Sequence, residues 1–323
     1  MTTQSPPPAG DAGFRAIGAL VIGESLVDIV PRHDGTTSEL PGGSPMNIAV
    51  GLARLGHDVR LATWIGRDDR GAVIADHVEE CGVWLLPGSD GAERTPTATV
   101  TFDEAGSAHY AFDLAWRCPP ITMHAAPQVT HVGSIGALLA PGAGDVAAAA
   151  RHFHGDSLIT YDPNIRPAAI PPHDESLALV EAVVAQADIV KVSQEDLAWL
   201  YPGRSSAVVA EDWLGRGPAL VVVTRGDQGV RALARDFVVG APAVPATVVD
   251  TIGAGDAFMA GLIDGLARRG LVGAAGRTAL RAAAPETLAA ILAWASRAAA
   301  ICVSRPGADL PWRNELDEDA PAW

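Results

Sequence analysis

Short runs of β-branched and aliphatic residues alternate with longer segments of helical periodicity, and this alternation restricts the fold more than any other feature of the sequence. The candidate strands are 16–22, 59–65, 129–132, 157–161, 188–192 and 219–224. The candidate helices are 45–55, 71–80, 144–153, 175–186, 207–214, 256–269 and 286–303. Such alternation predicts an α/β fold in which a mostly parallel sheet carries helices on both faces. We therefore expect ligands to bind beyond the carboxyl ends of the strands.

One stretch has a different period. Apolar and polar residues alternate along 97–102 and again along 108–114, on the two sides of a turn that contains glycine. This pattern predicts an antiparallel hairpin, which is too small to be stable alone. The hairpin would form an edge of the main sheet or, with 29–40, a small β-sheet lid that closes over a ligand or pairs with another subunit in a homodimer. The apolar side of the hairpin includes Val100, Phe102, Tyr110 and Phe112.

The composition excludes several classes of protein. Of the 323 residues, 48% are hydrophobic and 19% are charged, so the chain can bury a large core and is not disordered as a whole. The 23 basic and 38 acidic residues give a net charge of −15, which argues against a nucleic-acid partner because phosphate binding requires a basic face. The single lysine, Lys191, does not lie in a P-loop. No run is expected to reach the length of a membrane span.

The remaining organisation is simple. Three widely spaced cysteines form no CxxC pair, which disfavours disulfides and structural zinc and predicts a cytoplasmic protein. Residues 1–14 are rich in Pro, Gly and Ser and lack signal-peptide features, so we expect a disordered leader. We expect one folded domain over 15–313, with lid segments at about 29–41 and 95–118, and then an acidic C-terminal tail, 314–323.

The sharpest local motif is Gly253-Ala254-Gly255-Asp256, at the start of the candidate helix 256–269. Small residues before a helix let several backbone N–H groups point outward, and the helix dipole adds positive potential, so this segment can bind an anion. Asp256 would lie beside the anion, where a carboxylate can accept a proton from an attacking hydroxyl group. The structural alternative is that Asp256 only caps the helix after a glycine turn.

A second motif is the segment 40–56, LPGGSPMNIAVGLARLG. Ser44 is the expected N-cap of a helix that continues to the end of this segment. Gly42-Gly43 would allow a ligand to approach the backbone closely, and Asn47 would present its amide to that ligand. The structural alternative is a well-capped helix with an ordinary amide side chain.

Together the two motifs, about two hundred residues apart, resemble the PfkB carbohydrate kinases of the ribokinase-like superfamily. The resemblance extends over about 16–313, and bacterial fructokinases are the most similar branch. Further matching segments are GESLVD (23–28), DPNIR (162–166), KVSQED (191–196), VTRGDQG (223–229) and RPGA (305–308).

The resemblance implies an ATP-dependent sugar kinase with a ribokinase-like three-layer α/β/α core and a small β-sheet lid. Asp256 is then the catalytic base, and the amides of Gly253, Ala254 and Gly255 form the anion hole for the transferring phosphoryl group. The implied sugar-binding residues are Asp28, Gly42, Gly43, Asn47 and Arg166. Arg166 could reach either the sugar or the phosphate, and its structural alternative is a surface salt bridge.

The resemblance also implies nucleotide and metal sites. The nucleotide-binding residues are Ser193, Thr224, Gly226 and Gly229, and the structural alternative for the glycines is a simple hairpin into 230–233. Asp196 would help to organise Mg²⁺; Ser193 stands where the family often has asparagine, and Asp196 where it often has glutamate. Asp250, with backbone near Ile252, Cys302 and Gly307, resembles a pocket for a monovalent cation such as K⁺.

We therefore expect transfer of the γ-phosphoryl group of Mg·ATP to a primary hydroxyl of a small sugar, with fructose as the first candidate. Ribose, 2-keto-3-deoxygluconate and a nucleoside are the other acceptors. A dinucleotide-binding oxidoreductase is disfavoured because no GxGxxG follows the first strand. A non-catalytic sugar-binding regulator is disfavoured because Asp256 and its glycines are present.

Overall fold

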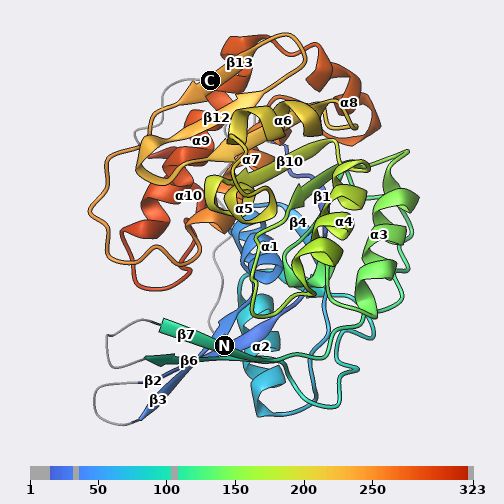
Figure 1. Cartoon of the computed structure of the whole chain (residues 1–323). Coiled ribbons are helices and arrows are strands. Elements are labelled where there is room, and N and C mark those ends of the chain that lie inside the picture. Colours follow the sequence, from blue (N-terminus) through green and yellow to red (C-terminus); the bar gives the residue numbers. More distant parts are fainter. Residues whose placement is uncertain (1–14, 32–35, 103–107, 319–323) are drawn as a thin grey trace.

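The computed structural model describes residues 15–31, 36–102 and 108–318. A central sheet lies between two layers of helices, and a second, smaller sheet stands at one end of the molecule (Figure 1). The predicted α/β/α core and the predicted small β-sheet are therefore confirmed. The leader expected over residues 1–14 lies outside the described residues.

The strands begin and end close to the predicted positions. The central sheet contains β1 (Gly18–Ile22), β4 (Asp58–Ala62), β5 (Val83–Leu85), β8 (Val129–Gly133), β9 (Leu158–Asp162), β10 (Ile189–Ser193), β11 (Leu220–Thr224), β12 (Val230–Leu233) and β13 (Val238–Ala241). The small sheet contains β2 (Leu26–Pro31), β3 (Thr37–Gly42), β6 (Thr97–Phe102) and β7 (Ala108–Asp113). The prediction missed β5 and β13, which have three and four residues and so carry little periodic signal.

The helices also follow the predicted pattern, with three that the pattern did not indicate: α5, α8 and α10. They are α1 (Ser44–Arg54), α2 (Asp69–Glu80), α3 (Gly142–Phe153), α4 (His173–Val184), α5 (Gln194–Leu200), α6 (Ser206–Leu214), α7 (Ala254–Arg268), α8 (Gly273–Arg281), α9 (Pro285–Val303) and α10 (Arg313–Asp317). Leu316 of α10 is fully buried. The tail boundary expected at residue 313 therefore falls at the start of a helix that packs on the domain.

The strand order of the central sheet places ligand-binding loops at one edge. The order is β13-β12-β11-β10-β9-β8-β1-β4-β5, and all neighbours are parallel except at β12 and β13, which are antiparallel. The chain passes from β1 to β4 on one side and later returns through β8 on the other. Ligands of open parallel sheets bind at such a switch point, beyond the carboxyl ends of the strands.

Each face of the central sheet has its own apolar core. Val21 and Val222 belong to the core shared with α1, α7 and α9, whereas Leu20 and Val221 belong to the core under α3, α4 and α6. Successive side chains of a strand point to opposite faces, so strands covered on both sides are apolar throughout. This explains the uninterrupted aliphatic runs in the sequence.

The small sheet has the order β3-β2-β6-β7, with β2 and β6 parallel and the other pairs antiparallel. The hairpin β6–β7 is therefore part of a separate lid sheet and not an edge of the main sheet. Val100 of β6 is 7% exposed, yet among the described side chains it belongs to neither core. The side chains of Phe102 and Tyr110 lie outside the described part of the structure.

Helix α9 corrects one expectation. By length and composition alone this helix of 19 residues could cross a membrane, whereas the sequence predicted no segment that long and apolar. In the structure Leu288, Ile291, Leu292 and Ala295 of α9 are buried in the core shared with α7. Side-by-side packing against α7 therefore accounts for the apolar composition of α9 (Figure 1).

Candidate active site

The amide of Ala254 donates to the carbonyl of Thr251 at 3.3 Å, and no side chain caps helix α7. Gly253 is its N-cap, with a φ of 77° that favours glycine. A Cβ atom on Gly255 would lie 2.9 Å from Nζ of Lys191, so the first turn of α7 is next to an ammonium group. Asp256 is the third residue of the helix, so it is not the cap that the structural alternative requires.

The two sequence motifs meet at Asp256. Ser44 Oγ donates a hydrogen bond of 2.6 Å to Oδ1 of Asp256, and Asn47 Nδ2 donates one of 2.8 Å to Oδ2. The prediction of Ser44 as the N-cap of α1 is wrong, because Gly43 is the N-cap, with a φ of 110°. The helix thus starts one residue earlier than predicted, and the Ser44 hydroxyl is available to Asp256.

The environment of Asp256 suits a proton acceptor. Burial raises the pKa of the Asp256 carboxyl above its ordinary value. The hydrogen bonds from Ser44 and Asn47 oppose this shift in pKa, as do the charges of Lys191 and Arg166. A carboxylate with a raised pKa is a stronger base, while the two donors fix its orientation.

Lys191 is a buried residue of the site that the sequence analysis did not assign. Its Nζ lies 2.8 Å from Oδ2 of Asp162, and the two side chains are 5% and 1% exposed. Burial raises the pKa of Asp162 to about 6, and Lys191 opposes that shift. Burial alone would lower the pKa of Lys191, but the nearby carboxylates of Asp162, Asp196 and Asp256 together raise it. The only signal in the sequence was a lone lysine inside an aliphatic strand.

The lid contributes an acidic side chain to the same region. Asp28 lies half-buried on β2 and packs against Gly42, where a Cβ atom would collide with its carboxylate. Burial raises the pKa of Asp28 to about 6, and the charge of Arg166 opposes this. A Cβ atom on Gly43 would lie 2.7 Å from the backbone oxygen of Glu24. The two glycines therefore permit close packing within the protein, whereas the sequence predicted that they allow a ligand to approach the backbone.

Arg166 is exposed and lies within electrostatic reach of three carboxyl groups. Its charge opposes the raised pKa values of Glu24, Asp28 and Asp256. The one hydrogen bond that its guanidinium makes in the described structure goes to the carbonyl of Ile165 at 3.0 Å. The surface salt bridge considered as the alternative is not observed among the described residues, and the guanidinium is accessible to a ligand.

Glu24 is a second buried group that sequence reasoning missed. It is 3% exposed, and its Oε2 accepts a hydrogen bond of 2.7 Å from the amide of Gly136. Burial raises the pKa of Glu24 to about 7, although a hydrogen bond from Ser134 opposes the shift. Ser134 has a φ of 54°, which is rare for a side chain other than glycine, so Glu24 stabilises a strained turn after β8.

The predicted nucleotide-binding turn follows β11. Thr224 ends that strand, and a short 3₁₀ turn leads to the antiparallel strand β12. Gly226 and Gly229 have φ values of 55° and 79°, so both sit in the left-handed region. The segment is a glycine hairpin, and it also lies at the carboxyl end of a central strand, so the two interpretations from the sequence are compatible.

Ser193 and Asp196 form the capping box of α5. Ser193 Oγ accepts from the Asp196 amide at 2.9 Å, and Asp196 Oδ2 accepts from the Ser193 amide at 3.2 Å. The other oxygen, Oδ1, accepts from the amide of Ile165 at 2.9 Å. Both oxygens of Asp196 therefore already bind backbone, whereas Oδ1 of Asp162 is buried without a hydrogen-bond partner in the described structure.

No three His, Cys, Asp or Glu side chains converge on one point within residues 15–31, 36–102 and 108–318. Mg²⁺ in kinases is held by one or two carboxylates together with phosphate oxygens. The unpartnered oxygen of Asp162, close to the start of α7, fits such a hydrated cation. Asp196 fits it less well, since it must keep its two backbone amides.

The segment before α7 is tied to the end of the chain. Asp250 accepts hydrogen bonds from the amides of Ile252 at 3.0 Å and Gly307 at 2.9 Å. Cys302 donates from its sulfur to the carbonyl of Ile252 at 3.6 Å. The structure thus brings together the four residues that the resemblance associated with a monovalent cation.

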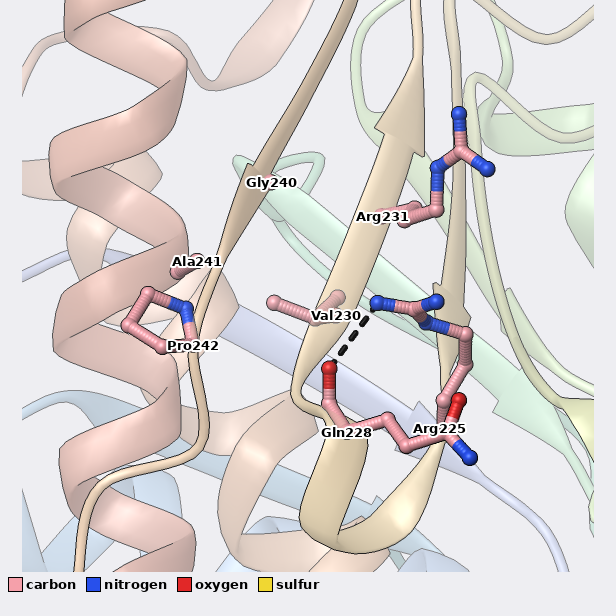
Figure 2. Close-up of a pocket in the computed structure, with 7 residues that line it drawn as sticks. All are labelled: Arg225, Gln228, Val230, Arg231, Gly240, Ala241 and Pro242. Atoms are coloured by element: carbon pink, nitrogen blue, oxygen red, sulfur yellow. Dashed lines mark hydrogen bonds between the residues drawn. The ribbon is translucent and has the colours of Figure 1, made fainter.

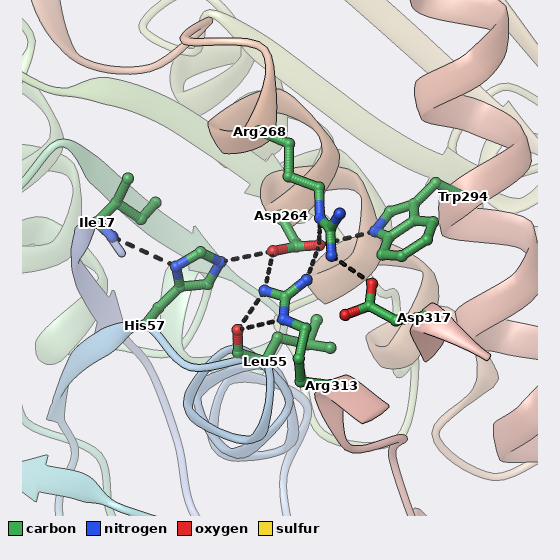
Figure 3. A network of polar contacts seen from close by, with 8 residues as sticks. All are labelled: Ile17, Leu55, His57, Asp264, Arg268, Trp294, Arg313 and Asp317. Carbon is green, nitrogen blue, oxygen red and sulfur yellow. Dashed lines mark hydrogen bonds and ion pairs between the residues drawn. The ribbon is translucent and has the colours of Figure 1, made fainter. Parts of the chain in front are cut away.

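Asp264 anchors α7 two turns beyond Asp256. Its fully buried carboxylate accepts hydrogen bonds from His57 at 2.9 Å and from Trp294 at 2.7 Å. Arg313 and Arg268 donate further bonds, at 3.0 Å and 3.3 Å. Figure 3 shows that these donors come from the segment after α1, from α9, from α10 and from α7 itself. This network fixes α7 relative to the helix that carries Asn47.

A helix end that can bind an anion, with a carboxylate base and an ammonium beside it under a small lid, is the arrangement of a phosphotransferase that acts on a hydroxyl group. Comparison with known proteins supports this class. Residues 18–315 match the family model described as "pfkB family carbohydrate kinase". A fructokinase of Klebsiella pneumoniae is 33% identical over 314 residues, which cover 92% of this chain and 97% of that protein.

Solved structures have the same fold. A fructokinase with bound ATP from Xylella fastidiosa superposes with a TM-score of 0.82 and 24% identity, covering 93% of this chain and 96% of that one. Aminoimidazole riboside kinase from Salmonella enterica, complexed with aminoimidazole riboside and an ATP analogue, gives a TM-score of 0.77 at 25% identity. It covers 93% of this chain and 99% of its own. The chain belongs to the pfkB family of carbohydrate kinases, as the resemblance of its motifs indicated.

Proposed function

We propose that this carbohydrate kinase transfers the γ-phosphoryl group of ATP to a primary hydroxyl of fructose. The observation that carries the proposal is the carboxylate of Asp256, held by Ser44 and Asn47 at the start of α7. The relatives named fructokinases support fructose as the acceptor. The riboside kinase of similar fold makes a riboside the second candidate.

In the proposed reaction, the sugar lies between Asp28 on the lid and Asn47 on α1. Asp256 accepts the hydroxyl proton as the sugar oxygen bonds to the γ-phosphorus and the bond to the β–γ bridging oxygen breaks, which releases ADP. The amides of Gly253, Ala254 and Gly255 and the ammonium of Lys191 face the charge on the transferring group.

ATP would lie along the carboxyl edge of the sheet. Its contacts would include the Thr224 turn and the region of Ser193. Mg²⁺, held by phosphate oxygens with Asp162 and Asp196 nearby, would neutralise phosphate charge. Asp250 and the carbonyl of Ile252 would provide oxygen atoms for K⁺, in the segment that leads into α7.

The lid would complete the site in one of two ways. Its apolar side would cover the bound sugar and exclude water, or it would pair with the lid of a second subunit in a homodimer. In either arrangement Val100 lies in the lid sheet and outside the main cores.

The test is a measurement of ADP release with a panel of sugars that includes fructose, ribose, 2-keto-3-deoxygluconate and a riboside, with and without K⁺. We expect fructose to have the highest kcat/KM. Asp256→Asn should lower the sugar-dependent ADP release by roughly 10²–10⁴-fold while leaving ATP binding intact. A higher kcat/KM for a riboside would change the acceptor, and ADP release unaffected by any sugar would contradict the proposal as a whole.

A further inference from the structure

Two segments that border the lid sheet meet at a single glycine. The chain first enters the lid just after Glu24, where β2 begins, and finally leaves it just before Trp116, where β7 has ended. Both residues bind the backbone of Gly136, in the turn that follows β8. Oε2 of Glu24 accepts a hydrogen bond from the Gly136 amide at 2.7 Å, and Nε1 of Trp116 donates one to the Gly136 carbonyl at 2.8 Å. The entry and the exit of the lid are therefore fixed to the same point of the core.

The packing around Gly136 leaves little space. A Cβ atom on Gly136 would lie 2.8 Å from Cα of Gly23 and 3.1 Å from Oε2 of Glu24. A Cβ atom on Gly142, the first residue of α3, would lie 2.3 Å from Nε1 of Trp116. Glu24 and Trp116 are each 3% exposed. Because both side chains are buried, water cannot replace either of them, and the loss of one leaves a buried polar group of Gly136 unpaired.

The turn that carries Gly136 also has an unusual backbone. Ser134 and Asn164 are the residues other than glycine that have a positive φ in the described chain, with values of 54° and 40°. Asn164 Nδ2 donates to Ser134 Oγ at 3.4 Å, and a further hydrogen bond joins Ser134 to Glu24. Such conformations persist only where the surroundings hold them, and they collect at functional sites. The turn after β8 is thus held by the lid entry on one side and by the segment leading to Arg166 on the other.

The position of the lid sets the distance between its acidic side chain and the rest of the site. Asp28 lies on the lid strand β2, which begins directly after the segment of Glu24. The charge of Arg166 acts on the carboxyl groups of both Asp28 and Asp256, so these three residues face one region. A displacement of Glu24 would therefore move Asp28 relative to Asp256.

We propose that Glu24 and Trp116 are positioning residues that hold the lid over the sugar site by binding Gly136 from its two sides. Neither residue touches the sugar or the nucleotide in this proposal. When one contact is lost, the lid covers the site for a smaller fraction of the time, and the apparent affinity for the sugar falls by the same factor. The role rests on the proposed function, because it concerns a lid that covers a sugar.

The first experiment measures amide hydrogen exchange in the full chain without ligands. Trp116→Phe removes the indole N–H and Glu24→Leu removes the carboxylate, and each should speed exchange in β2 and β7 by about tenfold. Strands β12 and β13, at the far edge of the central sheet (Figure 2), should exchange as before and serve as the internal reference. Glu24→Gln keeps an acceptor oxygen and should keep the slow exchange of the lid.

Trp213→Phe is the matched control. Trp213 is fully buried, and its Nε1 donates to the hydroxyl of Tyr201 at 2.9 Å, so this variant loses the same kind of hydrogen bond away from the lid. Its lid strands should exchange at the wild-type rate. Faster lid exchange in Trp213→Phe than in Trp116→Phe would overturn the proposal, as would equal acceleration in the lid and in β12–β13.

The double variant tests whether the two contacts act together. Glu24 and Trp116 bind one glycine, so Glu24→Leu combined with Trp116→Phe should speed exchange in the lid little beyond the faster single variant. If the two accelerations multiply instead, the residues act independently, and the shared role of Gly136 is wrong.

Kinetics separate positioning from a loss of folded protein. With fructose and ATP, each single variant should raise the KM for fructose by roughly tenfold and leave kcat and the KM for ATP within about twofold. A lower kcat with an unchanged KM for fructose would indicate a merely structural role and would overturn the proposal. The exchange measurements do not require activity. A wild-type protein that phosphorylates no sugar would therefore contradict the proposed function, whereas unchanged exchange in both single variants would contradict the role of Gly136.

Discussion

Asn47 on α1 and Asp256 on α7 are 209 positions apart in the chain, yet Nδ2 of the first lies 2.8 Å from Oδ2 of the second. Asn47 follows the lid strand β3, which ends at Gly42. The residue that orients the proposed base therefore lies on the segment that leaves the lid. Any shift of β3 towards a sugar would act on α1 and, through Asn47, on the orientation of the Asp256 carboxylate.

Asp256→Asn tests the base directly. The amide keeps the size of the side chain but cannot accept the hydroxyl proton, so turnover should fall by roughly 10²–10⁴-fold. Binding of sugar and ATP should persist, as measured by calorimetry. Near-normal turnover would show that Asp256 has only a structural role.

Ser44→Ala tests the electrostatics of the base. The Ser44 hydroxyl stabilises the ionised form of Asp256, so its removal raises a pKa that burial has already raised. We expect the acid limb of the kcat profile to move to higher pH by about one unit. Ser205→Ala, which removes the N-cap of the distant helix α6, should reduce stability without moving the profile.

Glu24→Gln tests a buried acid by its effect on stability. The pKa of Glu24 is about 7 in the folded protein and ordinarily 4.5. At pH values between these two pKa values the folded protein therefore binds more protons than the unfolded chain. The free energy of unfolding must therefore fall as the pH rises through this interval, by at most about 3 kcal/mol from this group.

Asp28 and Asp162, whose pKa values are both raised to about 6, also lower the free energy of unfolding as the pH rises. Glutamine cannot ionise, so Glu24→Gln should flatten the dependence of stability on pH, as measured by urea unfolding at several pH values. The same slope in the variant and in the wild type would contradict a raised pKa for Glu24.

Asp264→Asn tests the anchor of α7. Burial would raise the pKa of Asp264, but the hydrogen bonds from His57 and Arg313 outweigh it and hold this pKa below its ordinary value. Removing the charge leaves Arg313 and Arg268 without their buried partner, which should destabilise the protein by about 3–5 kcal/mol. Asp90→Asn breaks the exposed pair with Arg67 and should change the stability far less.

Val100→Ser tests the lid. Val100 packs in the small sheet, so its replacement should leave the thermal midpoint of the core nearly unchanged while raising the KM for the sugar or dissociating a dimer. Thermal melts, sugar titration and sedimentation distinguish these effects. A large fall in the midpoint, with sugar affinity and assembly unaltered, would show that the lid sheet is part of the core. Phe102→Ser should likewise leave the thermal midpoint nearly unchanged while raising the KM for the sugar or dissociating a dimer.

The layers of the fold could be predicted because each depends on a local period. The aliphatic runs of the buried strands, the helical spacing after Asp256 and the alternation along 97–102 report on single elements. The glycines and the acid at the start of α7 were recognisable for the same reason. The juxtaposition of Ser44 with Asp256 depends on strand order and helix packing, and no local pattern encodes these.

The buried charges were missed for a different reason. Lys191 and Glu24 lie in segments that look like ordinary strand and loop, and their importance comes from distant partners, Asp162 on β9 and Gly136 in the turn after β8. The exact start of α1 was predicted wrongly because the positive φ of Gly43 is a property of the folded backbone. Helix α9 looked too interrupted to span a membrane, although its apolar length is sufficient.

The single lysine has a practical consequence. An endoproteinase that cuts only after lysine has one possible target in this chain, the peptide bond after Lys191, and that bond lies inside the buried strand β10. Cleavage therefore requires the centre of the sheet to open, so its rate measures a large unfolding event and not the fraying of loops. Acylating reagents that modify side-chain amines are likewise kept from the buried Lys191, so their reaction with this protein would report on the opening of the region proposed for phosphoryl transfer.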